Sequence, residues 1–459
     1  MFRRLWKTKW LLRPTEILWY QWIGGIGSML MLGVIGMLIG MFSPLLAQMT
    51  SPNPSLFLTL DEASWVASLS SPARLVGAIF GSIGVHYLGG KRAMLIAGCP
   101  LLLAWVCLIL ADSAKWLYGT SFAHGLGIGI AFVSFPVYLG EVSSSATRGA
   151  LVSFAVSGFP LGSLIGNVLG TYLPKTTFGY IALAPTIVYI AIFLCVPESP
   201  HYFVRMGKLD QAERAISRYH PKVVVEEELQ SLQKFTSESN SITTGDRLRE
   251  LITPRNRKAG VIILLLYFFM HFSGLNSIIY YMEIILKTSK VTAISPATVV
   301  VVANVLDSVG GWVAMSLADR YGRKPMWIIS ACGACVSMLL TGVNFTLLAN
   351  GYNSHEQQWV PIICMISFRV FLFVGVFSLP SIFMSELIAP NVKGVVVCLA
   401  NIFAGLVAFA STKSYQPLLD AFGEACVFYL YAVIMLLALI FGMTLPETKG
   451  KTLQEIQNM

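Results

Sequence analysis

Charged residues are scarce in this sequence. Asp, Glu, Lys and Arg make up 12% of its 459 residues, against about a quarter of a typical soluble domain. Hydrophobic residues reach 55%, so too little polar surface is available to cover soluble domains built from a chain of this length. The shortage of charge excludes an ordinary soluble protein and indicates that lipid is the main solvent.

Several chemical motifs are also missing. No GxxxxGK[ST] segment is present, which argues against a pump driven by ATP. We find no nucleophile–base arrangement and no cluster of metal ligands, so we expect neither an enzyme nor a cofactor. The eight cysteines lie almost entirely inside apolar runs and are interpreted as reduced, small apolar residues.

Twelve apolar runs are long enough to cross a membrane as helices, which requires about 20 residues. The first six cover approximately residues 18–44, 62–88, 92–111, 115–140, 148–172 and 178–196, and the second six 259–286, 296–317, 326–347, 359–388, 394–416 and 424–445. We therefore expect an all-α membrane protein divided into residues 1–17, a six-helix bundle over 18–196, a helical linker over 197–258, a second bundle over 259–445 and residues 446–459.

The basic residues predict the orientation of these spans. The formal net charge is +9, and 25 of the 32 Lys and Arg residues fall on the side that holds both termini and the linker. Five fall on the opposite side, and Arg74 and Arg369 lie inside spans. This bias places the termini and the linker in the cytoplasm. Bases scattered between apolar runs do not form a nucleic-acid-binding face, so we expect a lipid bilayer and a small solute as partners.

The two halves repeat three short motifs in the same order. In the first motif, at 141–149 and at 386–394, an acid is followed seven residues later by a base and then by glycine. In the second, at 197–200 and 446–449, a Pro-Glu pair ends the sixth and twelfth spans. In the third, at 88–91 and 321–324, glycine with basic residues follows the second and eighth spans. Internal repeats of six spans are typical of secondary transporters, whose solute site lies between the halves near the middle of the membrane.

The charged members of these motifs predict a latch. Acids and bases at helix ends can form charge-assisted bonds between spans, which would hold the cytoplasmic side shut in an outward-facing carrier and break in an inward-facing one. The alternative is simple topology, in which bases retain the loops inside and Pro and Gly end the helices. The candidate latch residues are Glu141, Arg148, Glu198, Asp319, Arg320, Arg323, Glu386, Lys393 and Glu447.

The motifs resemble those of the sugar porter branch of the major facilitator superfamily. The residues that carry the resemblance are 136–141 (PVYLGE), 197–200 (PESP), 319–324 (DRYGRK) and 446–451 (PETKGK). Residues 62–66 and 273–276 make it most similar to insect facilitated trehalose transporters and facilitative hexose carriers. The resemblance implies the major facilitator fold, with two pseudo-symmetric six-helix bundles, alternating access and a plasma-membrane location.

The resemblance also implies a sugar site from which this sequence departs. Amides of the second half bind sugar hydroxyls in that family, and a tryptophan covers the sugar ring. Here the paired amides fall on Met270 and His271, the eighth-span amide on Asp307 and the tryptophan on Ser381. The residues expected to bind the substrate are Asn276, Asp307, His271, Tyr280, Tyr281 and Ser381.

Asp307 has three competing interpretations. It precedes Asp319 by twelve residues, about 18 Å along a helix, which places it near the middle of the membrane. It can replace the amide in binding sugar, it can pair with Arg74 or Arg369 or bind a cationic solute, or it can be tolerated in a wet cavity. Arg74 and Arg369 in turn can pair with an acid, face water or contact the substrate.

The first span bears on energy coupling. It has no Asp or Glu between Tyr20 and Phe57, and Ser121 stands where proton-coupled sugar porters carry an arginine. This favours facilitated diffusion of a sugar such as trehalose or a hexose, with an Asp307–His271 proton relay as the alternative. The rival functions are transport of another polar or cationic solute and solute sensing without transport.

Overall fold

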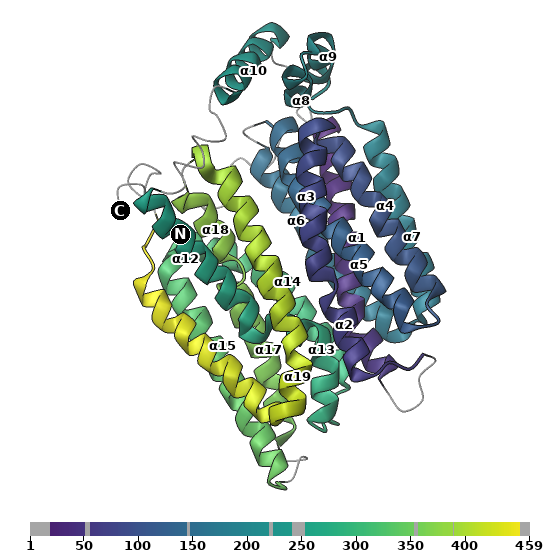
Figure 1. Cartoon of the computed structure of the whole chain (residues 1–459), viewed down its shortest axis with the longest axis vertical. Coiled ribbons are helices and arrows are strands. Elements are labelled where there is room, and N and C mark those ends of the chain that lie inside the picture. Colours follow the sequence, from purple (N-terminus) through teal and green to yellow (C-terminus); the bar gives the residue numbers. More distant parts are fainter. Residues whose placement is uncertain are drawn as a thin grey trace, which may run out of the picture.

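The computed structural model describes residues 19–50, 56–144, 147–219, 224–240, 253–352, 357–388 and 390–449. Every regular element in these ranges is a helix, and the helices form two bundles side by side, with three short helices above them (Figure 1). The all-α membrane fold expected from the sequence is confirmed.

The first bundle is built from the helices before the linker. They are α1 (Trp19–Met49), α2 (Leu60–Ser68), α3 (Ser70–Tyr87), α4 (Gly90–Leu110), α5 (Ala114–Val142), α6 (Arg148–Tyr172) and α7 (Lys175–Cys195). The linker contributes α8 (Pro200–Arg205), α9 (Leu209–Tyr219) and α10 (Val225–Asn240). The second bundle contains α12 (Pro254–Met270), η3 (His271–Leu275), α13 (Asn276–Thr288), α14 (Pro296–Tyr321), α15 (Arg323–Ala349), α17 (Trp359–Val374), α18 (Leu379–Leu387) and α19 (Pro390–Thr444).

Ten helices in the described ranges are long and apolar enough to cross a membrane. The last of them lies within α19, where Gly423 has a φ of 77° and the ribbon reverses direction (Figure 1), so this one element contains the predicted eleventh and twelfth spans. The predicted eighth span corresponds to α14, which is apolar over Pro296–Gly310, the part of its membrane stretch in which side chains are described. The predicted second span is α2 followed directly by α3, and α1 extends to Met49, five residues beyond its predicted end.

Glycine allows the helices of the first bundle to pack in backbone contact. A Cβ atom at Gly162 in α6 would lie 1.9 Å from the carbonyl oxygen of Gly33 in α1, and one at Gly36 would lie 2.1 Å from the carbonyl oxygen of Phe159. Small residues permit such close approach in membrane proteins, where packing rather than water drives helix association. The α1–α6 pair is therefore the tightly packed centre of this bundle.

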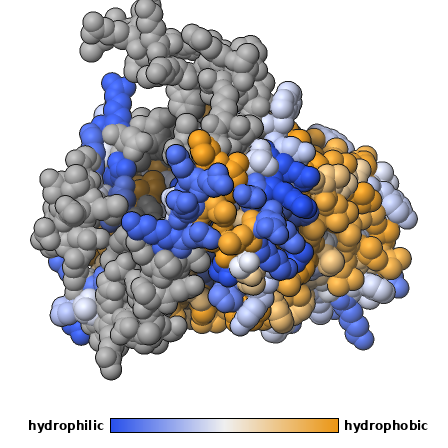
Figure 2. Space-filling model, turned by 90° about the horizontal axis from the view of Figure 1, so that it is seen from above, coloured by the Kyte–Doolittle hydropathy of each residue, from blue (hydrophilic) through white to orange (hydrophobic). Residues whose placement is uncertain are grey.

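Among the described residues, the main contacts between the two bundles involve four helix pairs. α1 packs against α13, α6 against α14, and α2 and α3 against α19. We call the end that carries α8 and α9 the linker end and the opposite end the far end. Viewed onto the linker end, hydrophilic residues gather above the bundles and hydrophobic residues cover the flank of the first bundle (Figure 2). This distribution suits a molecule surrounded by lipid on its sides.

The linker is fastened to the first bundle. The Gln21 Nε2 atom donates a hydrogen bond of 2.9 Å to the carbonyl oxygen of Tyr219, at the end of α9. The Tyr219 hydroxyl lies 2.9 Å from that of Tyr138 in α5 and donates to the carbonyl oxygen of Pro197 at 2.7 Å. Ala212 and Ile216 of α9 are fully buried, so the predicted amphipathic helix uses its apolar face to pack on protein.

Candidate functional site

A broken helix lies where the two bundles face each other. The predicted seventh span is interrupted by η3, a π-helical turn in which Gly274 has a φ of 90°. A Cβ atom there would lie 2.6 Å from the Tyr431 ring, so both the backbone conformation and the close packing require glycine. Such π-turns are frequent at functional sites. Here the turn presents His271 and Asn276 from its two ends.

Arg74 projects from α3 towards this broken helix. It is the fifteenth residue of the 28-residue span Leu60–Tyr87 and therefore lies near the middle of the membrane. Its guanidinium is 5.5 Å from the centre of the Phe132 ring of α5. It also interacts electrostatically with Tyr267 and Tyr280 and with His271 of the second bundle. Arg74 thus belongs to the contact between the bundles.

Three of the predicted substrate-binding residues cluster beside Arg74. His271 is buried, and its Nδ1 atom lies 3.2 Å from the Asn276 amide nitrogen. The Tyr280 ring lies 5.6 Å from Phe42 of α1, edge to face. The His271 carbonyl oxygen accepts a hydrogen bond of 2.7 Å from Ser411 of α19. The broken helix therefore carries an imidazole with its neighbouring amide and, about two turns further on, a phenol. These groups and the guanidinium of Arg74 can all bind hydroxyl or carboxyl groups.

Asp307 does not stand in this cluster as an open charge. It forms a buried ion pair with the Nη2 atom of Arg369 in α17, and the same nitrogen donates to Asn304 Oδ1 at 2.8 Å. Asp307 and Arg369 are each about 5% exposed. The pairing with Arg369 agrees with one of the three interpretations of Asp307, and the two charges cancel each other within the second bundle.

The remaining predicted binding residues lie apart from one another. Tyr281 stacks on Tyr415 with ring centres 5.0 Å apart and is almost completely buried. Ser381 is exposed on α18 and interacts with the Tyr267 hydroxyl. Tyr267, Asn304 and Phe132 were not predicted. Tyr267 precedes His271 by one helical turn and Asn304 precedes Asp307 by three residues, so the i, i+3 and i, i+4 spacing of polar groups was a signal available in the sequence.

The far end holds a contact between the bundles. The Lys413 Nζ atom of α19 lies 2.8 Å from Asp61 Oδ1 of α2 and 4.2 Å from the centre of the Trp65 ring. Trp65 also faces Phe409 at 6.5 Å. Nearby, a Cβ atom at Gly405 would lie 2.4 Å from a methyl carbon of Leu75 in α3. We call Asp61, Trp65, Phe409 and Lys413 the far-end contact; it joins α2 to α19.

At the linker end, the second bundle carries a carboxylate clamp. Glu447 accepts hydrogen bonds from the backbone nitrogens of Arg323 and Lys324, both at 3.1 Å, where Gly322 has a φ of 102°. Glu386 accepts from Arg323 Nη2 at 2.9 Å and from Thr448 at 2.6 Å. These bonds join helices α15, α18 and α19 of one bundle.

The first bundle repeats this clamp with one part missing. Glu198 accepts hydrogen bonds from the backbone nitrogens of Lys91 at 2.9 Å and Arg92 at 3.2 Å, beside Gly89, whose φ is 95°. Glu141 accepts from the Ser199 hydroxyl, as Glu386 does from Thr448. The position of Arg323, however, is occupied by Gly90, which has no side chain to bind Glu141. The internal repeat therefore exists in three dimensions, with an arginine in one copy only.

Two other predicted latch residues, Arg148 and Arg320, take no part in the described bonds of these clamps. Arg148 begins α6 and is exposed. Arg320 is exposed at the end of α14, its guanidinium lies 5.6 Å from the Tyr321 ring centre, and its carbonyl oxygen accepts from Lys449 Nζ at 2.6 Å. The side chains of Asp319 and Lys393 lie outside the described residues.

The two clamp carboxylates differ in their electrostatics. Burial raises the pKa of Glu198 and outweighs its backbone hydrogen bonds. At Glu447 burial is also the largest single effect and acts to raise the pKa, but the backbone hydrogen bonds from Lys449, Arg323 and Lys324 together outweigh it, so the pKa is lowered. Folding therefore favours the charged form of Glu447 and the neutral form of Glu198. The contribution of Glu447 to stability is present at neutral pH and is lost as the pH falls through its lowered pKa.

This difference gives a stability prediction. At pH 7, Glu447→Gln is expected to lower the free energy of unfolding by about 1 kcal/mol, whereas Glu198→Gln is expected to cost less, since it removes a charge that folding disfavours. Thermal unfolding of both variants in detergent measures the two effects, and the deficit of Glu447→Gln should shrink when the pH is lowered to about 4. Equal losses in both variants at both pH values would contradict the assignment.

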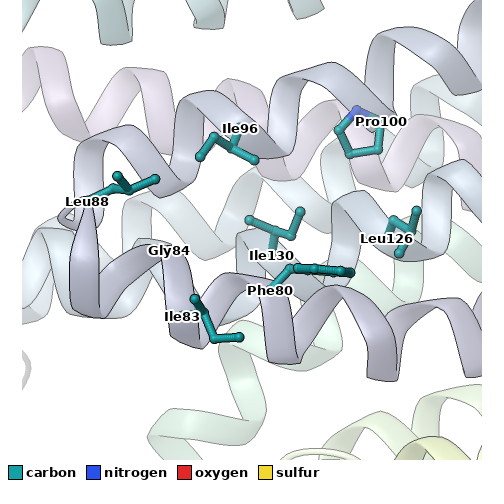
Figure 3. A pocket seen from close by; sticks show the side chains of 8 residues that line it. All are labelled: Phe80, Ile83, Gly84, Leu88, Ile96, Pro100, Leu126 and Ile130. Carbon is teal, nitrogen blue, oxygen red and sulfur yellow. The ribbon is translucent and has the colours of Figure 1, made fainter.

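A groove on the first bundle is unsuited to a polar solute. It has a volume of about 390 Å³ and lies between α3, α4 and α5, lined entirely by apolar residues such as Phe80, Ile83, Ile96 and Leu126 (Figure 3). It offers no hydrogen-bonding side chain to a hydroxyl or a charged group. Among the described residues there is also no group of three or more side chains able to hold a metal ion.

Comparison with known proteins supplies relatives for this arrangement. Residues 23–459 match a family described as "Sugar (and other) transporter". The chain is 28% identical over 451 residues, 97% of its length, to the facilitated trehalose transporter Tret1 of Drosophila pseudoobscura pseudoobscura, of which it covers 52%, and to that of Anopheles gambiae, of which it covers 57%. It thus spans about half the length of these relatives.

Solved structures agree in fold. The inward-open xylose transporter XylE from E. coli superposes with a TM-score of 0.75 at 18% identity, over 95% of this chain and 98% of that one. The proton:xylose symporter XylE bound to 6-bromo-6-deoxy-D-glucose superposes with a TM-score of 0.69 at 20% identity, over 96% and 98%. At such identities the likeness establishes the major facilitator fold. The match over 437 residues establishes more: the chain is a multi-pass membrane protein that belongs to the family of sugar (and other) transporters.

Proposed function

We propose that this protein is a facilitative transporter that carries a sugar-like solute across the plasma membrane by alternating access, with both termini and the linker in the cytoplasm. The observation that carries the proposal is the set of hydroxyl-binding groups at mid-membrane depth, His271, Asn276 and Tyr280, on a broken helix between two bundles. The relatives named as facilitated trehalose transporters make trehalose and hexoses the first solutes to measure.

The arrangement of bonds supports movement of each bundle as a unit. The clamps around Glu198 and Glu447 join helices of a single bundle, whereas the Asp61–Lys413 pair joins the two bundles at the far end. The proposed cycle breaks the far-end contact and brings the linker ends together, where the exposed cations Arg148 and Arg320 are available to the opposite bundle. In this proposal the clamps hold the helices of each bundle together, and Arg148 and Arg320 bind the opposite bundle at the linker end when the carrier faces outward.

Uptake into proteoliposomes tests the proposal and its coupling. We expect labelled solute to equilibrate across the membrane without accumulating, and an imposed pH gradient to leave the final distribution unchanged, because the first span carries no acid between Tyr20 and Phe57. Liposomes without protein measure leakage. Accumulation driven by the pH gradient would contradict uniport and would favour a relay through the protein's buried polar groups.

Removal of the far-end cation tests alternating access. Lys413→Gln removes both the ion pair with Asp61 and the contact with the Trp65 ring, together worth about 1 kcal/mol. We expect the population open at the far end to rise about five-fold. Spin labels at positions 60 and 422, which are exposed on α2 and α19, report the distance between the two bundles at the far end. The native cysteines are replaced first so that only these two positions are labelled.

The matched control for that experiment is Lys287→Gln. This residue pairs with Glu283 within α13, so its removal takes away a cation near the same end without touching the contact between bundles. A distance distribution that shifts equally in both variants, or in neither, would argue against the far-end contact as a gate.

The two rival functions have different outcomes. A carrier of cations would need an unbalanced acid in the site, and Asp307 is balanced by Arg369. A sensor would bind solute without flux, which a binding measurement on the protein used for uptake detects.

A further inference from the structure

Arg74 is the unbalanced charge of the central site. Within the described ranges its guanidinium has neither a hydrogen bond nor an ion pair, and its neighbours are the ring of Phe132 and the uncharged side chains of Tyr267 and Tyr280. Arg369, the other arginine inside a span, is by contrast paired with Asp307 and bound to Asn304. The spans thus hold one arginine that is paired with an acid and one that has no such partner among the described residues.

An unsatisfied arginine at this depth calls for an explanation. Ionisable groups inside a membrane are costly, and those that occur normally pair with another group or serve a pathway. Arginine stays protonated in proteins and presents a planar fork of donors that matches a carboxylate or phosphate. Packing alone does not account for Arg74, because the Phe132 ring attracts its positive charge but leaves the hydrogen-bond donors of the guanidinium without an acceptor.

The position of Arg74 determines which partner can reach it. It belongs to the first bundle, but the tyrosines and the histidine with which it interacts belong to the second. A partner that binds it must therefore enter between the bundles, which is the route of the proposed substrate. As a whole residue, Arg74 is intermediate in exposure, so it is not sealed off on every side.

We propose that the substrate carries a negative charge and that Arg74 binds it, which makes the preferred class hydroxylated monocarboxylates, such as sugar acids, over neutral sugars. This inference rests on the proposed transport function and names the substrate class of the same site. A carboxylate accepts two parallel hydrogen bonds from a guanidinium. The hydroxyl groups of the solute are left for Asn276, His271 and Tyr280, which supply both donors and acceptors.

The number of charges favours a carboxylate over a phosphate. Because Asp307 and Arg369 cancel each other, the described groups around the site supply one unbalanced positive charge. A carboxylate brings one negative charge, whereas a phosphate monoester brings between one and a half and two at neutral pH. The excess charge of a phosphate would remain uncompensated in a region of low dielectric constant, which is unfavourable.

Binding and uptake by the purified full chain test the inference. We expect glucuronate and gluconate to bind about 10- to 100-fold more tightly than glucose or trehalose, and Arg74→Gln to remove that preference, because a hydrogen-bonded ion pair is lost. Arg74→Lys should restore part of it. Lys208→Gln, which removes an exposed cation on the linker, is the matched control for net charge, and thermal unfolding checks that every variant is folded.

A membrane potential gives an independent readout of solute charge. In proteoliposomes held at about −100 mV inside, the distribution of a monoanion moved by uniport should shift outward about 50-fold, and that of glucose should not shift. The shift follows from the charge of the solute, so it identifies an anion as the transported species.

The outcomes separate the two proposals. Flux of neutral sugars that exceeds flux of the acids and is unchanged in Arg74→Gln would overturn the inference and leave the proposed function intact. Arginine-dependent binding of glucuronate without any flux would support the inference and overturn transport. Stronger competition by glucose 6-phosphate than by glucuronate would overturn the choice of a carboxylate.

Discussion

Replacement of Arg369 by methionine is expected to lower the free energy of unfolding by about 3–5 kcal/mol. The substitution leaves the Asp307 carboxylate buried without its cation. It also removes the hydrogen bond of 2.8 Å that Asn304 Oδ1 accepts from the arginine. Thermal or denaturant unfolding in detergent measures the loss. Arg214→Met, an exposed arginine on α9, is the control for removing a guanidinium and should change stability by no more than about 0.5 kcal/mol.

The double variant Asp307→Asn/Arg369→Met sharpens this prediction. Removing both charges together should recover most of the loss, since well-packed neutral residues often replace a buried pair at little cost. Asp307→Asn alone should be destabilising, because it leaves Arg369 unpaired. If the loss of unfolding free energy in the double variant equalled the sum of the two single losses, the two charges would not stabilise each other, and the interpretation of Asp307 and Arg369 as a stabilising ion pair would be wrong.

The second large effect is expected at the α1–α6 contact. Gly162→Ala places a methyl group where the Cβ atom would lie 1.9 Å from the carbonyl oxygen of Gly33. The contacted oxygen belongs to the backbone of α1 and cannot move aside like a flexible side chain, so the two helices must separate. We expect the free energy of unfolding to fall by about 3 kcal/mol. Protein yield and unfolding temperature in detergent measure it.

A glycine with free space provides the matched control. Gly140 lies in α5, and nothing approaches within 4 Å of the Cβ atom that would be added there. Gly140→Ala should leave stability unchanged or raise it, since alanine favours the helix by up to about 1 kcal/mol. If both variants behaved alike, helix propensity would dominate over the backbone contact, contrary to the packing described.

The sequence was sufficient for the architecture because the hydrophobic requirement of a membrane is strict. Each span must be about 20 apolar residues long. The predicted spans coincide with helices apart from their ends, except that the second, seventh and tenth spans are each divided into more than one helix. Helix ends were less predictable, since hydropathy marks the membrane and not the last turn of a helix; α1 continues to Met49. The join of the last two spans through Gly423 also depends on a local backbone angle that hydropathy does not report.

The site was only partly predictable. The sequence singled out Asp307, Arg369 and Arg74 as charges inside spans. Hydropathy does not report which helix faces which, so the pairing of Asp307 with Arg74 and its pairing with Arg369 both remained open. The structure places Asp307 beside Arg369 and leaves Arg74 beside aromatic rings. Tyr281 shows the converse difficulty. The pattern grouped it with Tyr280, yet adjacent residues of a helix point about 100° apart: the Tyr280 ring faces Phe42 of α1, whereas the Tyr281 ring stacks on Tyr415 of α19.

The attachment of α9 has a practical consequence for imaging. Through Tyr219, this helix is bonded to Gln21 and stands against Tyr138, so it keeps a fixed orientation relative to the first bundle. A chain of 50 kDa embedded in a detergent micelle offers little outside mass for particle alignment. An antibody fragment raised against the outer face of α9 would supply that mass as a rigid fiducial marker, and rotation of the second bundle could then be followed in its frame.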